Sequence, residues 1–357
     1  MSRASAFPPL PRGLRGRRAE LVTLAQALTP GARIALVGSG GSGKSMLAAA
    51  LAHRVSARFG GRLFWFRIGA WDYRTLSEML ALRFGTTRER SRIVRGLLSA
   101  LSAPSLVVLD NHEDDAATAR LLMALRPSPT TFIITARRCL LSGVLLFPVT
   151  APQVTSGESA FPRVAMLTRR LRWSPLALDI ADAFVASRAT TAPALATFLD
   201  EHGVSDVHVM EHEDDLPEVH LLLSWAWARL SAGSRRALGV LAHAFGDDMD
   251  VASLMTLARA RDVADLTALR RWHLVQEVAP GRFTVHAVVR HAVRKRTRPT
   301  PDLVFEHYVS MLERDPSRVL TEQTHLFAAM DHAHRISDMH AMLRVEKLLS
   351  RLEEIDS

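Results

Sequence analysis

Short runs of mostly apolar residues alternate with stretches of helical spacing along the first 150 residues. The runs predict buried strands, over residues 34–37, 63–66, 106–109, 131–134 and 144–149. Helical spacing begins near Arg18, and residues 45–59 form an alanine-rich helical stretch. Apolar strands separated by helices are typical of a parallel sheet that helices cover on both faces. We therefore predict an α/β domain with a five-stranded parallel sheet over residues 16–150, after a Pro-rich, basic lead-in over residues 1–15.

The strand pattern stops after Val149. Helical patterns then dominate, interrupted by an acidic linker over residues 211–218 and by a β-like stretch over residues 274–285 with a Pro-Gly turn. Helices followed by a hairpin and another helix favour a winged-helix arrangement. We therefore predict a helical domain, a winged-helix-like domain and a short all-α tail that would suit the start of helical repeats, over residues 151–210, 211–300 and 301–357.

A chain of 357 residues is too long for one compact core, and its 48% hydrophobic and 23% charged residues are ordinary for a globular protein. The net charge is +9, but arginines are scattered and only three residues are lysines, so nucleic acid is not demanded as a partner. The single cysteine, Cys139, excludes an intrachain disulfide and a multi-cysteine zinc site. Since residues 1–11 lack a signal-peptide core and no apolar run approaches 18 residues, we expect a cytoplasmic protein with no membrane partner.

One segment matches the phosphate-binding motif G-x-x-x-x-G-K-[ST] without a mismatch: Gly38, Ser39, Gly40, Gly41, Ser42, Gly43, Lys44 and Ser45. The glycines let backbone N–H groups turn toward phosphate oxygens, and the helix that follows directs its positive end at the same oxygens. We expect Lys44 to reach the β- and γ-phosphates and Ser45 to ligate Mg²⁺. Met46 completes the segment that we expect to surround ATP or ADP.

Such a site needs an acid that holds the magnesium, at the end of a neighbouring strand. Asp110 follows four apolar residues and is the predicted partner of Ser45 at the metal. Glu113 is the first candidate to orient or deprotonate the attacking water, with Asp114 second; these acids would equally suit the start of a helix. Arg137, at the end of the fourth strand, is the predicted sensor of the γ-phosphate, and a solvated loop arginine is the alternative.

These elements, in this order, resemble the NB-ARC-like branch of the STAND ATPases, the signal-transduction ATPases with numerous domains. The similar segments are G-R-R-A-E-L at residues 16–21, L-D-N-H-E at 109–113, T-A-R at 135–137, S-P-L-A-L at 174–178, and F-T-V-H at 283–286 in place of the family's M-H-D region. The resemblance covers residues from about Pro8 to Arg298.

The resemblance implies three further contacts to the nucleotide. The segment of Arg17 would pack over the adenine, Pro175 would contact the base, and His286 would meet the β-phosphate of ADP, although a lone histidine equally suits packing. Two departures stand out: Ala287 replaces the acid of M-H-D, and Trp173 replaces the glycine before the proline segment. Family members carry an effector domain or a long repeat array, and this sequence shows neither.

We therefore expect a nucleotide-operated regulatory switch and slow Mg-dependent ATPase, whose ATP state exposes a surface for a protein partner or for self-association. One alternative is a P-loop phosphotransferase with an unknown acceptor. Another is a winged-helix DNA-binding regulator that uses the basic cluster of Arg290, Arg294, Lys295, Arg296 and Arg298. No aromatic residues interleave with that cluster, so DNA is not favoured. The histidines at positions 202, 208, 212 and 220 match no zinc-site spacing.

Overall fold

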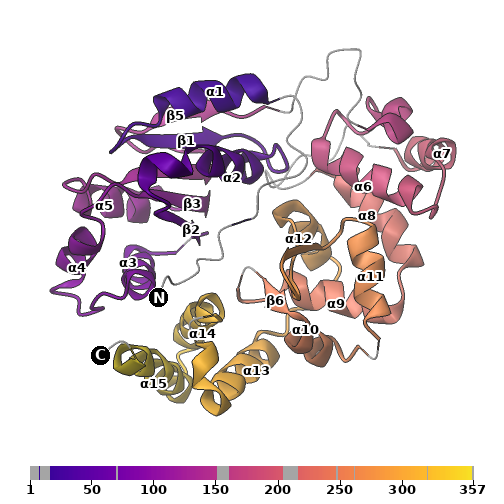
Figure 1. The fold of residues 1–357 in the computed structure, drawn as a ribbon. Coiled ribbons are helices and arrows are strands. Elements are labelled where there is room, and N and C mark those ends of the chain that lie inside the picture. The colour runs from indigo at the N-terminus through magenta and orange to yellow at the C-terminus, as the bar shows by residue number, and fades with distance from the viewer. Residues whose placement is uncertain are drawn as a thin grey trace. The chain divides into compact units, whose positions relative to one another are not determined.

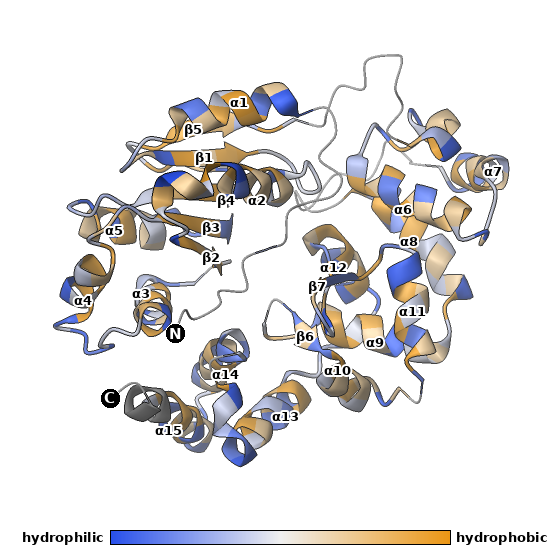
Figure 2. Ribbon diagram, viewed as in Figure 1, coloured by the Kyte–Doolittle hydropathy of each residue, from blue (hydrophilic) through white to orange (hydrophobic). Residues whose placement is uncertain are grey.

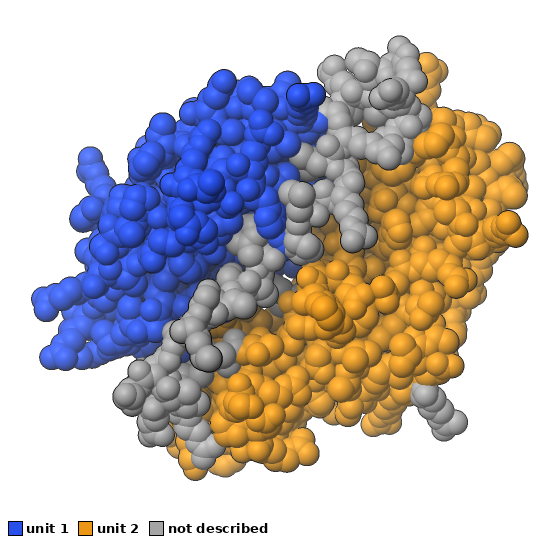
Figure 3. Space-filling model, in the orientation of Figure 1, with its two compact units in different colours: residues 1–153, 356–357 blue, residues 154–355 orange. Residues whose placement is uncertain are grey.

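The computed structural model describes Pro8 and residues 17–69, 71–150, 161–203, 216–246, 248–260, 262–319 and 321–355. Most of the predicted lead-in, the first ten residues of the predicted helical domain (151–160) and most of the acidic linker lie outside these residues. The chain divides into two compact units, residues 1–153 with 356–357 and residues 154–355 (Figure 3). Among the described residues, no helix combines the length and the apolar character needed to cross a bilayer.

Unit 1 contains the five-stranded parallel sheet that the hydrophobic pattern predicts (Figure 1). Its strands are β1 (Arg33–Val37), β2 (Leu63–Arg67), β3 (Leu106–His112), β4 (Thr131–Ala136) and β5 (Leu145–Pro148). They lie in the order β2-β3-β4-β1-β5, and every neighbouring pair is parallel. Strand β4 therefore separates β1 from β3, so the expectation that Asp110 lies on a strand next to β1 is wrong.

Helices cover both faces of this sheet. Alternate side chains of each strand point to opposite sides, so strands that are apolar throughout present apolar side chains to both layers of helices. The helices are α1 (Arg18–Ala27), α2 (Lys44–Val55) with a 3₁₀ turn at Ser56–Phe59, α3 (Tyr73–Phe84), α4 (Ile93–Ala100) and α5 (Asp115–Ala124). On one face, α1 and α2 pack against Ile34, Val108 and Ile133. On the other, the ring of Phe64 in β2 meets that of Phe84 in α3 with centroids 4.7 Å apart. In Figure 2, β1 is mostly hydrophobic, whereas α1 and α5 show both colours, as surface helices do.

Unit 2 is mainly helical and has one small antiparallel sheet. Its first part comprises the 3₁₀ segment Pro162–Leu167, α6 (Pro175–Ala186), α7 (Ala192–His202), α8 (Pro217–Arg229) and α9 (Ala232–Ala242). Its middle part comprises β6 (Met249–Asp250), α10 (Val251–Ala258), α11 (Ala264–Arg271), β7 (Gln276–Ala279), β8 (Arg282–Thr284) and α12 (Ala287–Arg294). Its last part comprises α13 (Pro301–Arg314), the 3₁₀ segment Pro316–Arg318, α14 (Gln323–Arg335) and α15 (Met339–Ile355). The hairpin of β7 and β8 turns at Gly281, whose φ of +72° suits glycine.

A partly buried charge network joins the small sheet of unit 2 to its last helices. The guanidinium of Arg282 in β8 donates to both carboxylate oxygens of Glu322, at 2.7 and 2.9 Å, and to Asp248 at 2.5 Å. Arg318 donates to the same Glu322 at 3.1 Å and to Asp250 at 3.0 Å. Burial raises the pKa of Glu322, but the hydrogen bonds from Arg282 and the attraction of neighbouring positive charge together outweigh burial and hold that pKa below its usual value.

His325 lies beside this network with no exposed surface. Its Nδ1 accepts the N–H of Gly246 at 3.0 Å, its Nε2 donates to the carbonyl of Asp248 at 2.6 Å, and its ring stacks on Tyr308 with centroids 3.7 Å apart. These contacts require the neutral ring, because an Nδ1 that accepts a hydrogen bond carries no proton. Burial lowers the pKa of His325 to about 4, against the attraction of Glu322.

We expect acid to destabilise unit 2 through His325. The unfolded state takes up a proton near the ordinary pKa of 6.5, whereas the folded state resists until about pH 4. Stability is therefore complete above pH 6.5 and falls as the pH drops toward 4, by about 3 kcal/mol in all. Denaturant unfolding across this range measures the loss. His325→Gln, which cannot gain a charge, should be less stable at neutral pH but show a flatter pH dependence; an unchanged pH dependence would contradict the assignment.

Candidate functional site

The loop between β1 and α2 has a backbone that its glycines make accessible. Gly41 and Gly43 have φ values of +74° and +88°, in the left-handed region that glycine adopts at little cost. Gly38 is constrained by proximity instead, since a Cβ there would lie 2.2 Å from the carbonyl oxygen of Val149. The N–H of Gly38 donates to the carbonyl of Ala136, so the loop begins where β4 ends.

The first turn of α2 and its flanking side chains face the same loop. Helix α2 starts after Gly43 without a side-chain cap, and the first N–H groups of any helix lack intrahelical partners. Those groups and the helix dipole favour an anion at this point. The ammonium of Lys44 donates to the carbonyls of Gly38 and Ser39, each at 2.7 Å, so it lies within the curve of the loop. The buried hydroxyl of Ser42 has no hydrogen-bond partner among the described residues.

The carboxylate of Asp110 accepts two side-chain hydrogen bonds at this edge of the sheet. Its Oδ1 accepts the hydroxyl of Ser45, from α2, at 2.6 Å and that of Thr135, from β4, at 2.5 Å. Thr135 thus links β4 to the end of β3, and Ser45 links the start of α2 to the same carboxylate. Asp110 is only 6% exposed, yet its neighbour Ser45 is exposed, so the pair combines a fixed carboxylate with an accessible hydroxyl.

A backbone irregularity produces this arrangement. The pairing of β3 with β4 shifts register between Leu109 and His112, and Asn111 has a φ of +59°. Asparagine tolerates the left-handed region better than most residues do. The N–H of Asn111 then donates to the Thr135 hydroxyl at 3.0 Å. The strand therefore continues to His112, past Leu109, where the apolar run ends.

Arg17 precedes the loop between β1 and α2 in the sequence and donates a hydrogen bond to the backbone of that loop. It is 4% exposed, and one guanidinium nitrogen donates to the carbonyls of Ser42, at 2.6 Å, and Thr150, at 2.7 Å. The other donates to both oxygens of Glu20 at 3.0 Å. Arg17 thus connects the start of α1, the loop and the segment after β5. The carbonyls of Val149 and Thr150 were not recognised in the sequence, because a contact through backbone leaves no signal in residue type.

The acidic residues after Asp110 divide between two roles. Asp114 is the N-cap of α5 and accepts the N–H of Ala117 at 2.9 Å, which is the structural role that its position allowed. Glu113 is exposed, and it accepts the side-chain amide of Asn111 at 2.8 Å. Arg137 comes directly after Ala136, the last residue of β4, whose carbonyl the loop contacts.

The other predicted residues lie on α2 or in unit 2. Met46 is 43% exposed in the first turn of α2. Pro175 is the first residue of α6, after the N-cap Ser174. Trp173 has a φ of +59°, which explains why glycine suits this position. His286 caps α12, and its Nδ1 accepts the N–H of Val288 at 3.2 Å, so the neutral ring carries its proton on Nε2.

The basic cluster of α12 is partly engaged within unit 2. Arg294 donates to the carbonyl of Ala242 at 2.7 Å, and Arg296 donates to the hydroxyl of Ser224. Burial lowers the pKa of Arg296. These contacts reduce what the cluster can offer to a nucleic-acid backbone. Of the four histidines between 202 and 220, His208 and His212 lie outside the described residues.

Comparisons with known proteins agree with the motifs. No protein-family model matches the sequence. The chain is 29% identical to the regulatory protein AfsR of Streptomyces coelicolor over 287 residues, which cover 72% of this chain and 28% of that protein. A STAND protein with a tetratricopeptide repeat sensor from Pyrococcus horikoshii matches with a TM-score of 0.57 and 15% identity, over 99% of this chain and 60% of that chain. The chain therefore spans less than a third of the first protein and about three fifths of the second.

These matches confirm the resemblance to STAND ATPases, as a shared fold and as a distant sequence similarity to a bacterial regulatory protein. The narrower NB-ARC-like assignment stays a prediction. Both relatives extend well beyond the region that this chain matches.

The close approach of Gly38 to Val149 yields a test of the loop geometry. We expect Gly38→Ala to destabilise unit 1 by about 3 kcal/mol, because the new methyl group would overlap a backbone carbonyl. Gly60→Ala is the matched control. Gly60 has a φ of +55° and no atom near its Cβ position, so only conformational strain of about 1 kcal/mol is expected there. Thermal unfolding of both variants checks this, and equal losses would show that the loop does not lie against Val149.

Proposed function

We propose that this chain is a regulatory ATPase, a switch that binds ATP or ADP with Mg²⁺ at residues 38–45, the loop after β1 together with the first two residues of α2. One observation carries the proposal: an ammonium group, a helix N-terminus and a hydroxyl-carboxylate pair surround one glycine-lined loop. This is the set of groups that a polyphosphate and its cation require. The resemblance to STAND ATPases and to a bacterial regulatory protein supports the regulatory role.

The residues of the loop fit a polyphosphate for physical reasons. Gly41 and Gly43 adopt positive φ values and carry no side chains, so that part of the backbone is open to a ligand that accepts hydrogen bonds from N–H groups. The orphaned Ser42 hydroxyl lies in the same loop. Lys44 would exchange its contacts with the Gly38 and Ser39 carbonyls for phosphate oxygens, and a charged partner makes the stronger hydrogen bond.

Ser45 and Asp110 would hold Mg²⁺, which prefers oxygen ligands and keeps several waters. The nucleotide supplies the phosphoanhydride bond, and Mg²⁺ neutralises charge on its phosphates. Thr135 keeps the Asp110 carboxylate oriented. Glu113 would position or deprotonate the attacking water, and Arg137 would sense the γ-phosphate from the end of β4. Asp114 is the weaker candidate for the base because it already caps α5. We expect slow ATP hydrolysis, because the useful output of a switch is its change of state and not the rate of turnover.

The remaining assignments extend this proposal along the chain. The Arg17 segment would lie over the adenine, with Arg17 itself positioning the loop through its two carbonyl contacts. Pro175 would contact the base and His286 the β-phosphate of ADP, as the resemblance implies. We assign residues 16–150 to the nucleotide-binding domain, 151–210 to a helical domain, 211–300 to a winged-helix domain and 301–357 to a helical tail. The element order from α9 to β8, three helices with a three-stranded antiparallel sheet, supports the winged-helix assignment.

The two alternatives have less support. A phosphotransferase needs an acceptor pocket with its own catalytic residues, and no described group suggests one beside the loop. Binding of DNA by α12 is weakened by the contacts that Arg294 and Arg296 make within unit 2. We therefore propose a protein partner or self-association, controlled by the nucleotide, as the output of the switch.

Replacing Lys44 tests the nucleotide site. We expect Lys44→Ala to lower ATP and ADP affinity by at least a hundredfold, since it removes a charge from the centre of the loop. Lys347→Ala, on the exposed side of α15, is the matched control and should bind as the wild type does. Isothermal titration calorimetry measures both. Unchanged affinity in Lys44→Ala would overturn the site.

Replacing Asp110 tests the metal position separately. Asp110→Asn keeps the shape of the side chain but removes its charge, so we expect Mg²⁺ to strengthen ATP binding far less than in the wild type. Binding without Mg²⁺ should change little. Titrations with Mg²⁺ and with a chelator make the comparison. An equal Mg²⁺ effect in both proteins would place the cation elsewhere.

A further inference from the structure

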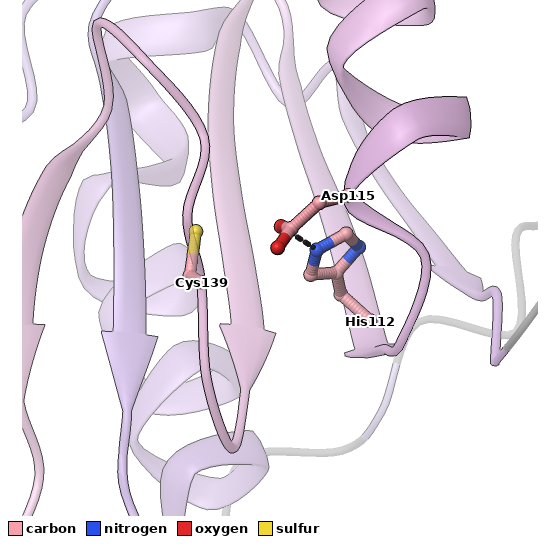
Figure 4. A group of neighbouring side chains, drawn as sticks. All are labelled: His112, Asp115 and Cys139. Carbon is pink, nitrogen blue, oxygen red and sulfur yellow. Dashed lines mark hydrogen bonds and ion pairs between the residues drawn. The ribbon is translucent and has the colours of Figure 1, made fainter.

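Three side chains of different chemistry lie close together in unit 1, and none of them belongs to residues 38–45 (Figure 4). His112 ends β3, Asp115 begins α5, and Cys139 lies in the segment after β4. A ring nitrogen, a carboxylate oxygen and the sulfur all lie within 4.8 Å of one another. Figure 4 shows the Asp115 carboxylate between the sulfur and the imidazole. His112 and Cys139 are buried, whereas Asp115 is partly exposed.

Two of these side chains are already oriented by other contacts. The Nε2 of His112 is 2.8 Å from Asp115 Oδ1, and its Nδ1 is 3.0 Å from the buried hydroxyl of Thr118. The second oxygen of Asp115 accepts the N–H of Leu140 at 3.1 Å. A ligating histidine usually donates its other ring N–H to an oxygen, and a ligating carboxylate is usually hydrogen-bonded itself. The hydroxyl of Thr118 and the N–H of Leu140 lie in positions to give this support to His112 and Asp115.

We propose that His112, Asp115 and Cys139 form a binding site for Zn²⁺, with water as the fourth ligand. Zinc accepts nitrogen, sulfur and carboxylate oxygen in one tetrahedral site. Bonds of about 2.0 to 2.3 Å place neighbouring ligand atoms roughly 3.3 to 3.8 Å apart, so shifts of about an ångström complete the geometry. Mg²⁺ is a poor occupant, because it prefers oxygen ligands in an octahedron.

Binding would require Nε2 of His112 to offer its lone pair, which leaves the proton on Nδ1 for the Thr118 oxygen. The thiol of Cys139 would release its proton to water on forming the metal–sulfur bond. Burial raises the pKa of this thiol, so the free group is uncharged and the cation must displace the proton. No change of oxidation state is involved.

The site would join the end of β3, the start of α5 and the segment that carries Arg137. His112 is two residues from Asp110, and Cys139 is two residues from Arg137. A bound cation would therefore restrain the two segments that flank the proposed nucleotide site. The zinc site itself does not depend on the proposed function, because none of its ligands belongs to the loop Gly38–Ser45.

Cobalt(II) is the probe, because it replaces zinc in such sites and its spectrum identifies the ligands. We expect the full-length, nucleotide-free protein to bind one equivalent of Co²⁺ with a thiolate-to-cobalt charge-transfer band and the intense visible bands of tetrahedral coordination. Added Zn²⁺ should remove these bands. Cys139 is the only cysteine, so the charge-transfer band can come from no other residue. Absence of the band at saturating Co²⁺ would overturn the proposal, whatever the variants do.

The variants separate this site from other cobalt sites. Cys139→Ser should abolish the charge-transfer band, and Asp115→Asn should weaken Co²⁺ binding at least tenfold, in the range that loss of a ligand or its support gives. His334→Asn, at an exposed position of α14, is the histidine control and should bind as the wild type does. Lys44→Ala should also keep the band, so failure of the nucleotide site and failure of the zinc site give different results. A band that survives Cys139→Ser, or Co²⁺ binding of unchanged affinity in Asp115→Asn, would contradict the assignment.

Discussion

The carboxylate of Asp110 is the contact on which the arrangement of this site depends. It accepts hydrogen bonds from the hydroxyls of Ser45 in α2 and Thr135 in β4, and so joins the end of β3 to the neighbouring strand β4 and to the helix that follows β1. A buried carboxylate is costly unless its lone pairs are satisfied, and here short hydrogen bonds satisfy it. The same bonds hold the Ser45 hydroxyl in the first turn of α2, where it can coordinate a cation that prefers oxygen ligands.

The loop itself is shaped by contacts from outside its own sequence. Gly38 lies against the carbonyl of Val149, and Arg17 reaches the carbonyls of Ser42 and Thr150. The start of α1, the loop between β1 and α2 and the segment after β5 therefore form one hydrogen-bonded group. Such a group can respond to a ligand as a whole, which is the property that a nucleotide-operated switch needs. Unit 2 holds a comparable polar group, where Arg282 and Glu322 join the small sheet to the last helices.

Much of unit 1 could be predicted from local signals. Apolar runs mark the five strands, and the loop motif specifies its own residues and the helix after it. What could not be predicted depends on tertiary contacts. The position of β4 between β1 and β3, the bulge at Asn111 and the backbone contacts of Arg17 have no local pattern. The sequence shows a single cysteine, but the approach of Cys139 to His112 and Asp115 comes only from the fold. The positions of Pro175 and His286 relative to a nucleotide remain predictions from the resemblance.

The proposed switch requires residues 38–45 to hold a polyphosphate through Lys44, Ser45 and Asp110. A crystal structure of the full chain grown with excess Mg²⁺ and a non-hydrolysable ATP analogue tests it most directly. We expect the phosphates inside the loop, the Lys44 ammonium on phosphate oxygens rather than on the Gly38 and Ser39 carbonyls, and the cation between Ser45 and Asp110. A structure in which Lys44 keeps those two carbonyls and the analogue lies elsewhere or does not bind would contradict it.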